Sequence, residues 1–350
     1  MPRYLLLLTL TACGASQTPA TDAGSAPTDA SAAPADANAP AADAGLASPD
    51  AEQPVADASA PLADAAASPD AAGSASDAGS VAADAGEVEP GASLRPGVQE
   101  IIVEQRVAGE LAMRRVVIQA PGRLVPAERY PVVFAFHGNG GRPEAFLGQL
   151  QRFVDAGRFV AILPEGLERS WNLGRERSQA DDVAFVELIV ERLRAYPNLN
   201  LNRAFAYGYS NGSGLVNQLA ARTNLFRGYA MAASALTQEL LPPEEVHLAS
   251  VLSLHGTEDQ ACPYDGGRGV GGHDFLAVED SAALWARKMG CSRFPISSRT
   301  DDGNRRLDWS PCREGHRVLH YGFQGAGHGL PMNQEGGVLN LVVSFFEETP

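Results

Sequence analysis

The stretch Ala204-Phe205-Ala206-Tyr207-Gly208-Tyr209-Ser210-Asn211-Gly212 decides the fold. The apolar residues at 204–207 predict a buried strand, and the sequence from Asn211 onward has the pattern of a helix. Between them lies Gly-x-Ser-x-Gly, which in a strand, turn and helix context holds a serine on a tight turn above a sheet. Glycine is needed at both ends of this motif because side chains there would collide with neighbouring backbone. The stretch therefore predicts a nucleophile elbow at Ser210.

Apolar, β-branched runs alternate with helical patterns on both sides of the motif. This alternation is typical of a mostly parallel sheet with helices on both faces, so the sequence predicts an α/β fold. Asp181 and Asp182 suit a helix N-terminus. The expected strands are residues 111–119, 131–136, 159–163, 204–207, 249–254 and 317–323, and the expected helices are residues 143–156, 182–196, 211–222, 276–288 and 336–346.

A serine nucleophile needs a base, and the base needs an acid that orients it. His328 lies in Gly325-Ala326-Gly327-His328-Gly329, directly after the last expected strand, where a glycine-rich loop can bring an imidazole over Ser210. We therefore predict His328 as the base. The other histidines are interpreted as loop-shaping residues (His137, His255) or as surface and packing residues (His247, His273, His316, His320).

The acid is sought beyond the strand at 249–254, because catalytic groups of such sheets gather at the carboxyl ends of the strands. Asp259 lies there, in His255-Gly256-Thr257-Glu258-Asp259. We predict Asp259 as the acid, with Glu258, Asp265 and Asp274 as alternatives.

The loop His137-Gly138-Asn139-Gly140-Gly141 follows the early strand at 131–136. Small residues are needed in such a loop when backbone amides must approach a substrate carbonyl. We predict an oxyanion hole formed by the amides of Asn139 and Asn211, with a plain glycine turn as the alternative.

The chain begins with Met1-Pro2-Arg3, an apolar run at 4–10, and Leu10-Thr11-Ala12-Cys13-Gly14. This segment, residues 1–13, resembles a bacterial lipoprotein signal, which implies lipidation of Cys13 and anchoring to the cell envelope. The alternatives are an ordinary secretory leader or a misassigned start codon. The run is too short to span a membrane, and no later segment qualifies.

Residues 14–92 consist mainly of Ala, Asp, Pro, Ser and Gly and contain no aromatic residue. Such a segment cannot bury enough apolar surface to offset its ordering entropy, so we predict a disordered linker. Many of its aspartates recur every seven residues, but the repeat lacks large apolar positions and is interrupted by prolines, which argues against a coiled coil. A calcium site is the alternative to a flexible spacer.

The formal net charge of -15 is concentrated in this linker, which holds 13 acidic residues. Residues 93–350, the expected catalytic domain, carry 29 acidic and 26 basic residues and are nearly neutral. This composition offers no basic patch of the kind that binds nucleic acid, so we expect no nucleic-acid partner.

Residues 131–330 resemble the feruloyl esterase and polyhydroxybutyrate depolymerase-like esterases of carbohydrate esterase family one. The resemblance implies an α/β-hydrolase fold and ester hydrolysis by Ser210, Asp259 and His328. Cys262, Cys291 and Cys312 permit three pairings by sequence alone, and the resemblance implies a disulfide between Cys291 and Cys312. The motifs that carry it are His137-Gly138-Asn139-Gly140-Gly141, Ser170-Trp171-Asn172, Asp181-Asp182-Val183, Gly208-Tyr209-Ser210-Asn211-Gly212, His255-Gly256-Thr257-Glu258-Asp259, Pro263-Tyr264-Asp265-Gly266-Gly267 and Gly325-Ala326-Gly327-His328.

The expected substrates are feruloyl or acetyl esters of polysaccharides, or hydroxyalkanoate oligoesters, with Trp171 and Tyr209 in contact with them. Two departures weaken the inference about substrate: Gly329-Leu330-Pro331 replaces the aromatic residue that many relatives have after the histidine, and Gly269-Val270-Gly271-Gly272 enlarges a loop that we interpret as flexible. We expect a monomer without metal or cofactor. The alternative functions are a surface-tethered binding protein without turnover and a serine peptidase.

Overall fold

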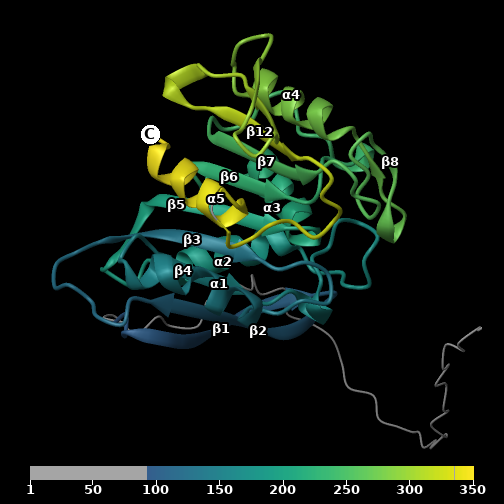
Figure 1. The fold of residues 1–350 in the computed structure, drawn as a ribbon. Coiled ribbons are helices and arrows are strands. Elements are labelled where there is room, and N and C mark those ends of the chain that lie inside the picture. The colour runs from purple at the N-terminus through teal and green to yellow at the C-terminus, as the bar shows by residue number, and fades with distance from the viewer. Residues whose placement is uncertain (1–92, 335) are drawn as a thin grey trace, which may run out of the picture. The chain divides into compact units, whose positions relative to one another are not determined.

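The computed structural model describes residues 93–334 and 336–350, so the predictions for Cys13, the leader and the linker lie outside the described residues. The described chain forms a ten-stranded sheet in the order β1-β2-β4-β3-β5-β6-β7-β12-β11-β10, and a separate pair, β8 and β9 (Figure 1). The strands are β1 Gly97–Val107, β2 Glu110–Ala120, β3 Tyr130–Phe136, β4 Val160–Pro164, β5 Leu199–Tyr209, β6 Gly228–Ala232, β7 Ser250–Gly256, β8 Gly267–Arg268, β9 Asp274–Phe275, β10 Ile296–Arg299, β11 Arg305–Asp308 and β12 Val318–Phe323.

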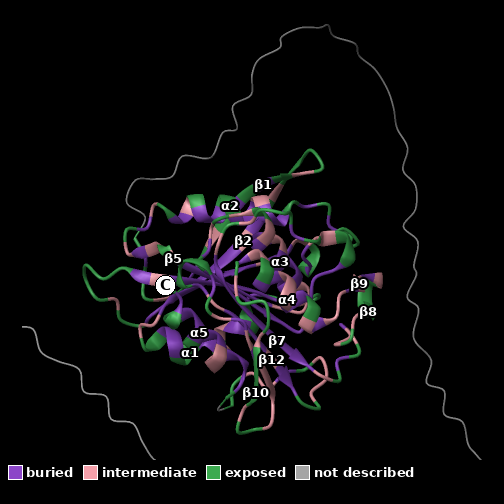
Figure 2. Cartoon of the chain, turned by 90° about the horizontal axis from the view of Figure 1, so that it is seen from above, coloured by how far each residue is buried: buried purple, intermediate pink, exposed green. Residues whose placement is uncertain are grey.

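Helices cover both faces of the sheet (Figure 1), and the strands in the middle of the molecule are largely buried, as their purple colour shows (Figure 2). One apolar cluster packs α2, α3 and α4 against the sheet, and a second packs α1 and α5 against the other face. The helices are α1 Glu144–Asp155, α2 Asp182–Leu193, α3 Asn211–Arg222, α4 Val278–Lys288 and α5 Val338–Glu348, and single 3-10 turns occur at Leu167–Arg169, Gln238–Leu240, Val270–Gly272 and Arg313–Gly315.

The middle of the sheet is parallel. Strands β4, β3, β5, β6, β7 and β12 pair in parallel in that order, whereas both edges of the sheet are antiparallel. The carboxyl ends of the parallel strands therefore meet at one edge of the sheet, where loops after β3, β5, β7 and β12 come together. The fold confirms the predicted α/β-hydrolase class, a mostly parallel sheet with helices on both faces.

Every expected strand and helix is present, but the sequence analysis missed β1, β6, β10, β11 and the two-residue strands β8 and β9. Strand β6 is short and rich in Gly and Ala, and its burial comes from pairing with β5 and β7. Strand β10 is exposed along its whole length, so it lacks the apolar alternation that marks a half-buried strand. Strand β5 starts at Leu199, earlier than the expected start at 204.

The two aspartates at the start of α2 have different roles. Asp181 caps the helix, because its carboxylate accepts the amide of Ala184 at 3.1 Å. Asp182 is instead buried in an ion pair with Arg114 of β2 at 2.8 Å, and it accepts the amide of Asn172 at 2.7 Å. Burial raises the pKa of Asp182, and the charge of Arg114 opposes this effect. Asp182 therefore joins the start of α2 to β2 through Arg114 and to the segment that follows β4 through Asn172.

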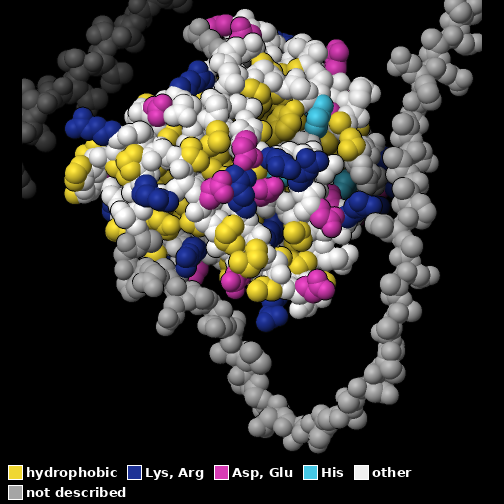
Figure 3. Space-filling view, turned by 90° about the horizontal axis from the view of Figure 1, so that it is seen from below, with side chains coloured by type: hydrophobic (Ala, Val, Ile, Leu, Met, Phe, Trp, Pro, Cys, Tyr) yellow, Lys and Arg dark blue, Asp and Glu magenta, His cyan; other side chains and the backbone are white. Residues whose placement is uncertain are grey.

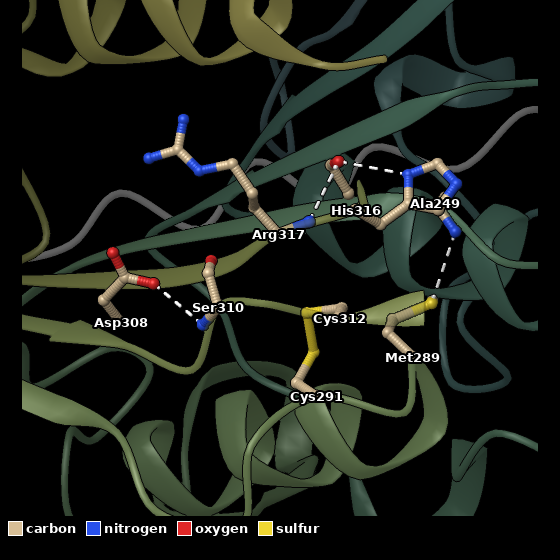
Figure 4. Close-up of a disulfide and its surroundings, with 9 residues drawn as sticks. Ala249, Met289, Cys291, Asp308, Ser310, Cys312, His316 and Arg317 are labelled. Atoms are coloured by element: carbon tan, nitrogen blue, oxygen red, sulfur yellow. Dashed lines mark hydrogen bonds between the residues drawn. A yellow bond between two sulfur atoms is a disulfide. The ribbon is translucent and has the colours of Figure 1, made fainter. Parts of the chain in front are cut away.

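Cys291 and Cys312 form a disulfide, which is the pair that the resemblance implied (Figure 4). It joins the segment after α4 to the loop before β12, across a separation of 21 residues. In the chain-entropy model a loop of this length contributes about 3 kcal/mol. Near the bond, the sulfur of Met289 accepts the amide of Ala249 at 3.3 Å (Figure 4). Cys262 is buried and forms no disulfide within the described residues.

Acidic and basic side chains are interspersed on the face of the molecule seen in Figure 3. Specific ion pairs are also present: Arg115 lies 2.5 Å from Glu100, 2.6 Å from Glu144 and 3.2 Å from Glu165. Opposite charges thus compensate one another locally, as the near balance of acids and bases after residue 92 suggests. In the part of the chain that the structure describes, no helix combines the length and the apolar character needed to cross a membrane.

Candidate active site

Ser210 lies at the junction of β5 and α3, in a strained backbone conformation with φ 55° and ψ -120°. Its amide donates to the carbonyl of Ala232 on β6 at 2.8 Å. A Cβ on Gly208 would lie 2.3 Å from the carbonyl oxygen of Gly212, and a Cβ on Gly212 would lie 2.1 Å from that of Phe136. Both positions therefore require glycine, and the turn has the geometry predicted for an elbow.

Three predicted residues, each from the end of a different parallel strand, come together at this turn. The Nε2 atom of His328 lies 2.8 Å from Oγ of Ser210, and its Nδ1 atom lies 2.8 Å from Oδ2 of Asp259. An ionised carboxylate can only accept, so Nδ1 carries the proton and Nε2 offers its lone pair to the serine hydroxyl. The arrangement has the hydrogen-bond order of a Ser-His-Asp triad.

Asp259 is buried, yet four N–H groups surround its carboxylate. Oδ1 accepts the amides of Ala261 at 2.8 Å and Cys262 at 2.9 Å. Oδ2 faces His328, and also Nε2 of His255 at 3.2 Å. Burial by itself would raise the pKa of Asp259, but the hydrogen bonds from His255 and His328 outweigh it and hold the pKa well below the usual range. The group is therefore ionised at neutral pH.

The alternative acids do not reach the histidine. Glu258 is exposed. Asp274 lies 3.6 Å from Arg268. Asp265 makes no side-chain hydrogen bond to His328, whose Nδ1 is bonded to Asp259. Asp259 is thus the acid that the structure brings to His328.

The loop after β3 contacts the nucleophile: a Cβ on Gly138 would lie 3.3 Å from Cβ of Ser210. Among the described residues, the backbone amides of Asn139 and Asn211 take part in no hydrogen bond. Oxyanion donors require amides without another acceptor, and both of these amides meet that condition within the described residues. Their assignment as the oxyanion hole stays a prediction.

His137 holds this loop in place. Its Nε2 accepts the amide of Gly166 at 3.0 Å, so Nδ1 carries the proton and donates to the carbonyl of Gly138 at 2.8 Å. Burial lowers the pKa of His137, which keeps the ring neutral. The loop-shaping role expected for His137 is consistent with these contacts.

Trp171 requires a correction. Its side chain has 0% exposed surface, packs edge-on against Phe136, and donates from Nε1 to the carbonyl of His137 at 2.8 Å. The prediction that it contacts substrate is therefore wrong: it supports the loop after β3 from within the core. Tyr209 is half-buried beside Ser210, and its hydroxyl donates to the carbonyl of His328 at 2.5 Å, so it holds the loop that carries the base.

Glu176 is a residue near the nucleophile that the sequence analysis missed. Its Oε1 accepts from Nδ2 of Asn211 at 3.3 Å and from Nε2 of His273 at 3.1 Å. Its Oε2 accepts the amides of Leu173 at 2.6 Å and Arg175 at 3.2 Å. The carboxylate thus joins the residue after the nucleophile to two loops. Burial would raise the pKa of Glu176, but the bond from His273 and the two amides lower it.

His273 follows directly after the loop that contains Gly271 and Gly272. Both glycines have positive φ, 69° and 75°, a conformation that favours glycine and turns the chain so that His273 points inward. No signal in the sequence could pair His273 with Glu176, since 97 residues separate them.

A second buried network lies behind Asp259. His320 of β12 is fully buried, with Nδ1 3.1 Å from Oγ of Ser253 and Nε2 2.8 Å from the hydroxyl of Tyr264. The Tyr264 hydroxyl also donates to Glu279 at 3.1 Å. Burial, reinforced by the nearby His255, lowers the pKa of His320 to about 3. His320 is therefore a neutral packing residue, in agreement with its interpretation from the sequence.

No protein-family model matches the chain. It is 23% identical to feruloyl esterase B of Piromyces equi over 229 residues, which cover 61% of this chain and 42% of that protein. It is 25% identical to feruloyl esterase C of Emericella nidulans over 231 residues, with 63% and 78% covered. Among solved structures, the acetyl xylan esterase from Aspergillus awamori matches with a TM-score of 0.49 and 13% identity, over 67% of this chain and 94% of that chain.

The chain thus spans less than half the length of the feruloyl esterase from Piromyces equi. Both relatives in sequence are feruloyl esterases by name, at identities of 23% and 25%. In residues 93–334 and 336–350, no group of three or more His, Cys, Asp or Glu side chains is placed to hold a metal ion.

The contacts of Glu176 predict that Glu176→Gln lowers kcat by roughly tenfold with a smaller change in KM, because misplacing a residue beside the nucleophile impairs the reaction more than binding. In the wild type, both oxygens of the Glu176 carboxylate accept hydrogen bonds. The glutamine amide replaces one oxygen with an NH₂ group, so at least one of the donors loses its acceptor. Steady-state kinetics on para-nitrophenyl acetate measure the effect. Glu239→Gln is the control, since its carboxylate contacts only exposed Arg175. Equal kcat values for Glu176→Gln and the control would contradict the prediction.

The lowered pKa of His320 predicts an acid-dependent loss of stability. Unfolded histidine takes up a proton near pH 6.5, whereas folded His320 does so only near pH 3, so the unfolded state binds more protons between these values. Its contribution to stability is complete above pH 6.5 and declines as the pH falls toward 3. Urea unfolding of the wild type and of His320→Gln at several pH values measures this, and the difference between the two should vary with pH. A constant difference would show that His320 does not titrate this way.

Proposed function

We propose that the chain is a serine esterase that hydrolyses carboxylic esters through an acyl-enzyme on Ser210. The observation that carries the proposal is the continuous pair of hydrogen bonds from Ser210 through His328 to Asp259, each 2.8 Å long, on a strained elbow. The similarity to feruloyl esterases favours the same reaction class. Residues 93–350 are proposed as the catalytic domain.

In the first half of the reaction, Oγ of Ser210 attacks the ester carbonyl carbon while Nε2 of His328 takes the hydroxyl proton. The imidazolium that forms is stabilised by the ionised Asp259. The carbonyl oxygen becomes an oxyanion, and the free amides of Asn139 and Asn211 are the proposed donors to it. Collapse of the tetrahedral intermediate breaks the bond to the alcohol oxygen, which receives the proton from His328.

In the second half, a water molecule takes the place of the alcohol. His328 accepts a proton from this water, whose oxygen attacks the acyl carbon, and the bond to Oγ of Ser210 breaks. Ser210 regains its proton from His328, and the acid is released. In each half, His328 takes up one proton and then releases it, so the enzyme returns to its starting protonation state without a cofactor that supplies or removes protons.

The proposed substrates are feruloyl or acetyl esters of polysaccharides, or hydroxyalkanoate oligoesters. The names of the two feruloyl esterases favour the first of these. Tyr209 stays the proposed substrate contact, since it lies partly exposed next to Ser210. Initial rates on matched feruloyl, acetyl and hydroxybutyryl esters rank the three classes.

The proposed location is the bacterial cell envelope, with Cys13 lipidated and residues 14–92 as a spacer; we further propose a monomer. The lipobox-like Leu10-Thr11-Ala12-Cys13 supports the anchor. Mass spectrometry of the N-terminal peptide of the mature protein tests it. A diacylated Cys13 is expected, and an unmodified Cys13 would contradict the anchor.

The nucleophile assignment predicts that Ser210→Ala lowers kcat by roughly four to six orders of magnitude with the fold intact, because triad members act as a unit. Hydrolysis of para-nitrophenyl esters measures the loss, and circular dichroism checks the fold. A fluorophosphonate probe should label the wild type and leave the variant unlabelled.

Ser213→Ala is the matched control. Ser213 lies in the first turn of α3, the helix that Ser210 precedes. It is buried, and its hydroxyl has no hydrogen-bond partner among the described residues. Removal of this hydroxyl should therefore leave kcat within about twofold of the wild-type value. If Ser210→Ala kept wild-type turnover, the nucleophile would lie elsewhere. If the wild type were labelled by the probe but turned over no ester, a binding or peptidase function would replace the esterase.

A further inference from the structure

A second histidine contacts the acid of the triad. His255 lies near the end of β7, four residues before Asp259, and its side chain has no exposed surface. Its Nε2 atom lies 3.2 Å from Oδ2 of Asp259 and 2.8 Å from the carbonyl oxygen of Cys262. The same Oδ2 accepts the Nδ1–H of His328 at 2.8 Å. One carboxylate oxygen is therefore shared between two imidazoles.

The partners of His255 fix its tautomer. A carbonyl oxygen and a carboxylate oxygen are both acceptors, so Nε2 must carry a hydrogen, which it directs between them. The other nitrogen, Nδ1, is buried without a hydrogen-bond partner among the described residues. A proton on Nδ1 would be a buried donor without an acceptor, which is costly. In this tautomer the single N–H of His255 bonds to the Cys262 carbonyl oxygen and also lies against Oδ2 of Asp259.

The ring of His255 has little freedom to turn away. It meets the ring of Tyr264 edge-on, with centroids 6.0 Å apart, and the Tyr264 hydroxyl is held by His320 at 2.8 Å. The titratable groups that face it are the Asp259 carboxylate, the Cys262 thiol, Tyr264 and His320. Only the carboxylate among these is charged at neutral pH, because burial raises the pKa of the Cys262 thiol to about 12 and lowers that of His320 to about 3.

The contact between His255 and Asp259 is not needed to give either side chain a hydrogen-bond partner. The carbonyl of Cys262 alone would satisfy the N–H of His255, and Asp259 already accepts from Ala261, Cys262 and His328. The additional N–H at Oδ2 instead competes with His328 for the same oxygen. It is also a second contact at Oδ2, in addition to the His328 ring and to the two amides of the turn at 259–262 that bond to Oδ1.

We infer that His255 is a positioning residue of the triad: its Nε2–H holds the Asp259 carboxylate toward His328 and, by sharing Oδ2, limits how strongly Asp259 stabilises the imidazolium of His328. The inference rests on the proposed esterase function, since it concerns the base of that reaction. A donor that shares the acceptor weakens the other bond, so His255 moderates the basicity of His328 while fixing its orientation.

Removal of this donor should have two effects of different kind. In His255→Phe, Oδ2 bonds to His328 alone, so the acid limb of the kcat/KM profile should move to higher pH by roughly half a unit. Looser orientation of the carboxylate should lower kcat at the plateau by roughly tenfold. In His255→Gln, a side-chain amide can donate to the same oxygen, so both quantities should return most of the way to the wild-type values.

The experiment combines the pH profile with proton NMR of the resting enzyme. The Nδ1–H of His328 should give a low-field resonance that moves further downfield in His255→Phe and returns in His255→Gln. Ser213→Ala is the control for disturbance of the buried core, because the Ser213 hydroxyl is buried and has no hydrogen-bond partner among the described residues, and it should leave the resonance and the acid limb unchanged. If His255→Phe does not fold, His255→Asn replaces it, because its shorter amide falls short of Asp259 while staying polar.

The outcomes separate the inference from the proposed function. A folded His255→Phe with an unchanged resonance and an unchanged acid limb would overturn the inference, as would a glutamine variant that behaves like the phenylalanine variant. Because the NMR measurement needs no turnover, a protein that hydrolyses no ester but shows the expected resonance shifts would overturn the proposed function and retain the contact between His255 and the triad.

Discussion

The site depends on the absence of a side chain at Gly212. A Cβ there would lie 2.1 Å from the carbonyl oxygen of Phe136, so helix α3 can begin only where glycine lets it touch the end of β3. This contact brings the turn at Ser210 against the loop at Gly138, which is the loop that contains Asn139. The parallel direction of β5, β7 and β12 then delivers the nucleophile, the acid and the base to the same edge. The close backbone contact at Gly212 is thus a condition for the placement of the catalytic groups.

Burial of Asp259 creates the second requirement. A carboxylate removed from water is costly unless its oxygens accept hydrogen bonds, and here the turn at 259–262 supplies two amides while two histidines supply the rest. The hydrogen bonds from the two histidines, together with those from the turn, hold the pKa of Asp259 low despite its burial, and the ionised carboxylate in turn orients His328. Tyr209 adds a bond to the carbonyl of His328, so the base is held at its ring and at its backbone.

The sequence predicted the elements whose signals are local. The elbow, the base and the acid each follow a strand and lie beside glycines, so a motif and its context sufficed for Ser210, His328 and Asp259. Trp171 was misjudged because a motif shows neither which way a side chain points nor what covers it. Strand β6 was missed because its burial comes from its neighbours and not from its own pattern. The contact between Glu176 and His273 depends on a loop conformation set by two glycines with positive φ, and no periodicity encodes it.

The charges of the site illustrate the limit of composition as a guide. Most of the excess negative charge lies in residues 14–92, yet the acids around Ser210 are each matched by a specific partner: Asp259 by His328 and His255, Glu176 by His273, and Asp182 by Arg114. The first two carboxylates are matched by imidazoles, whereas Asp182 faces a guanidinium that is always charged. Each pair joins residues that a loop or a helix start brings together, so the charge balance at the site is set contact by contact, and a count of acidic and basic residues does not reveal it.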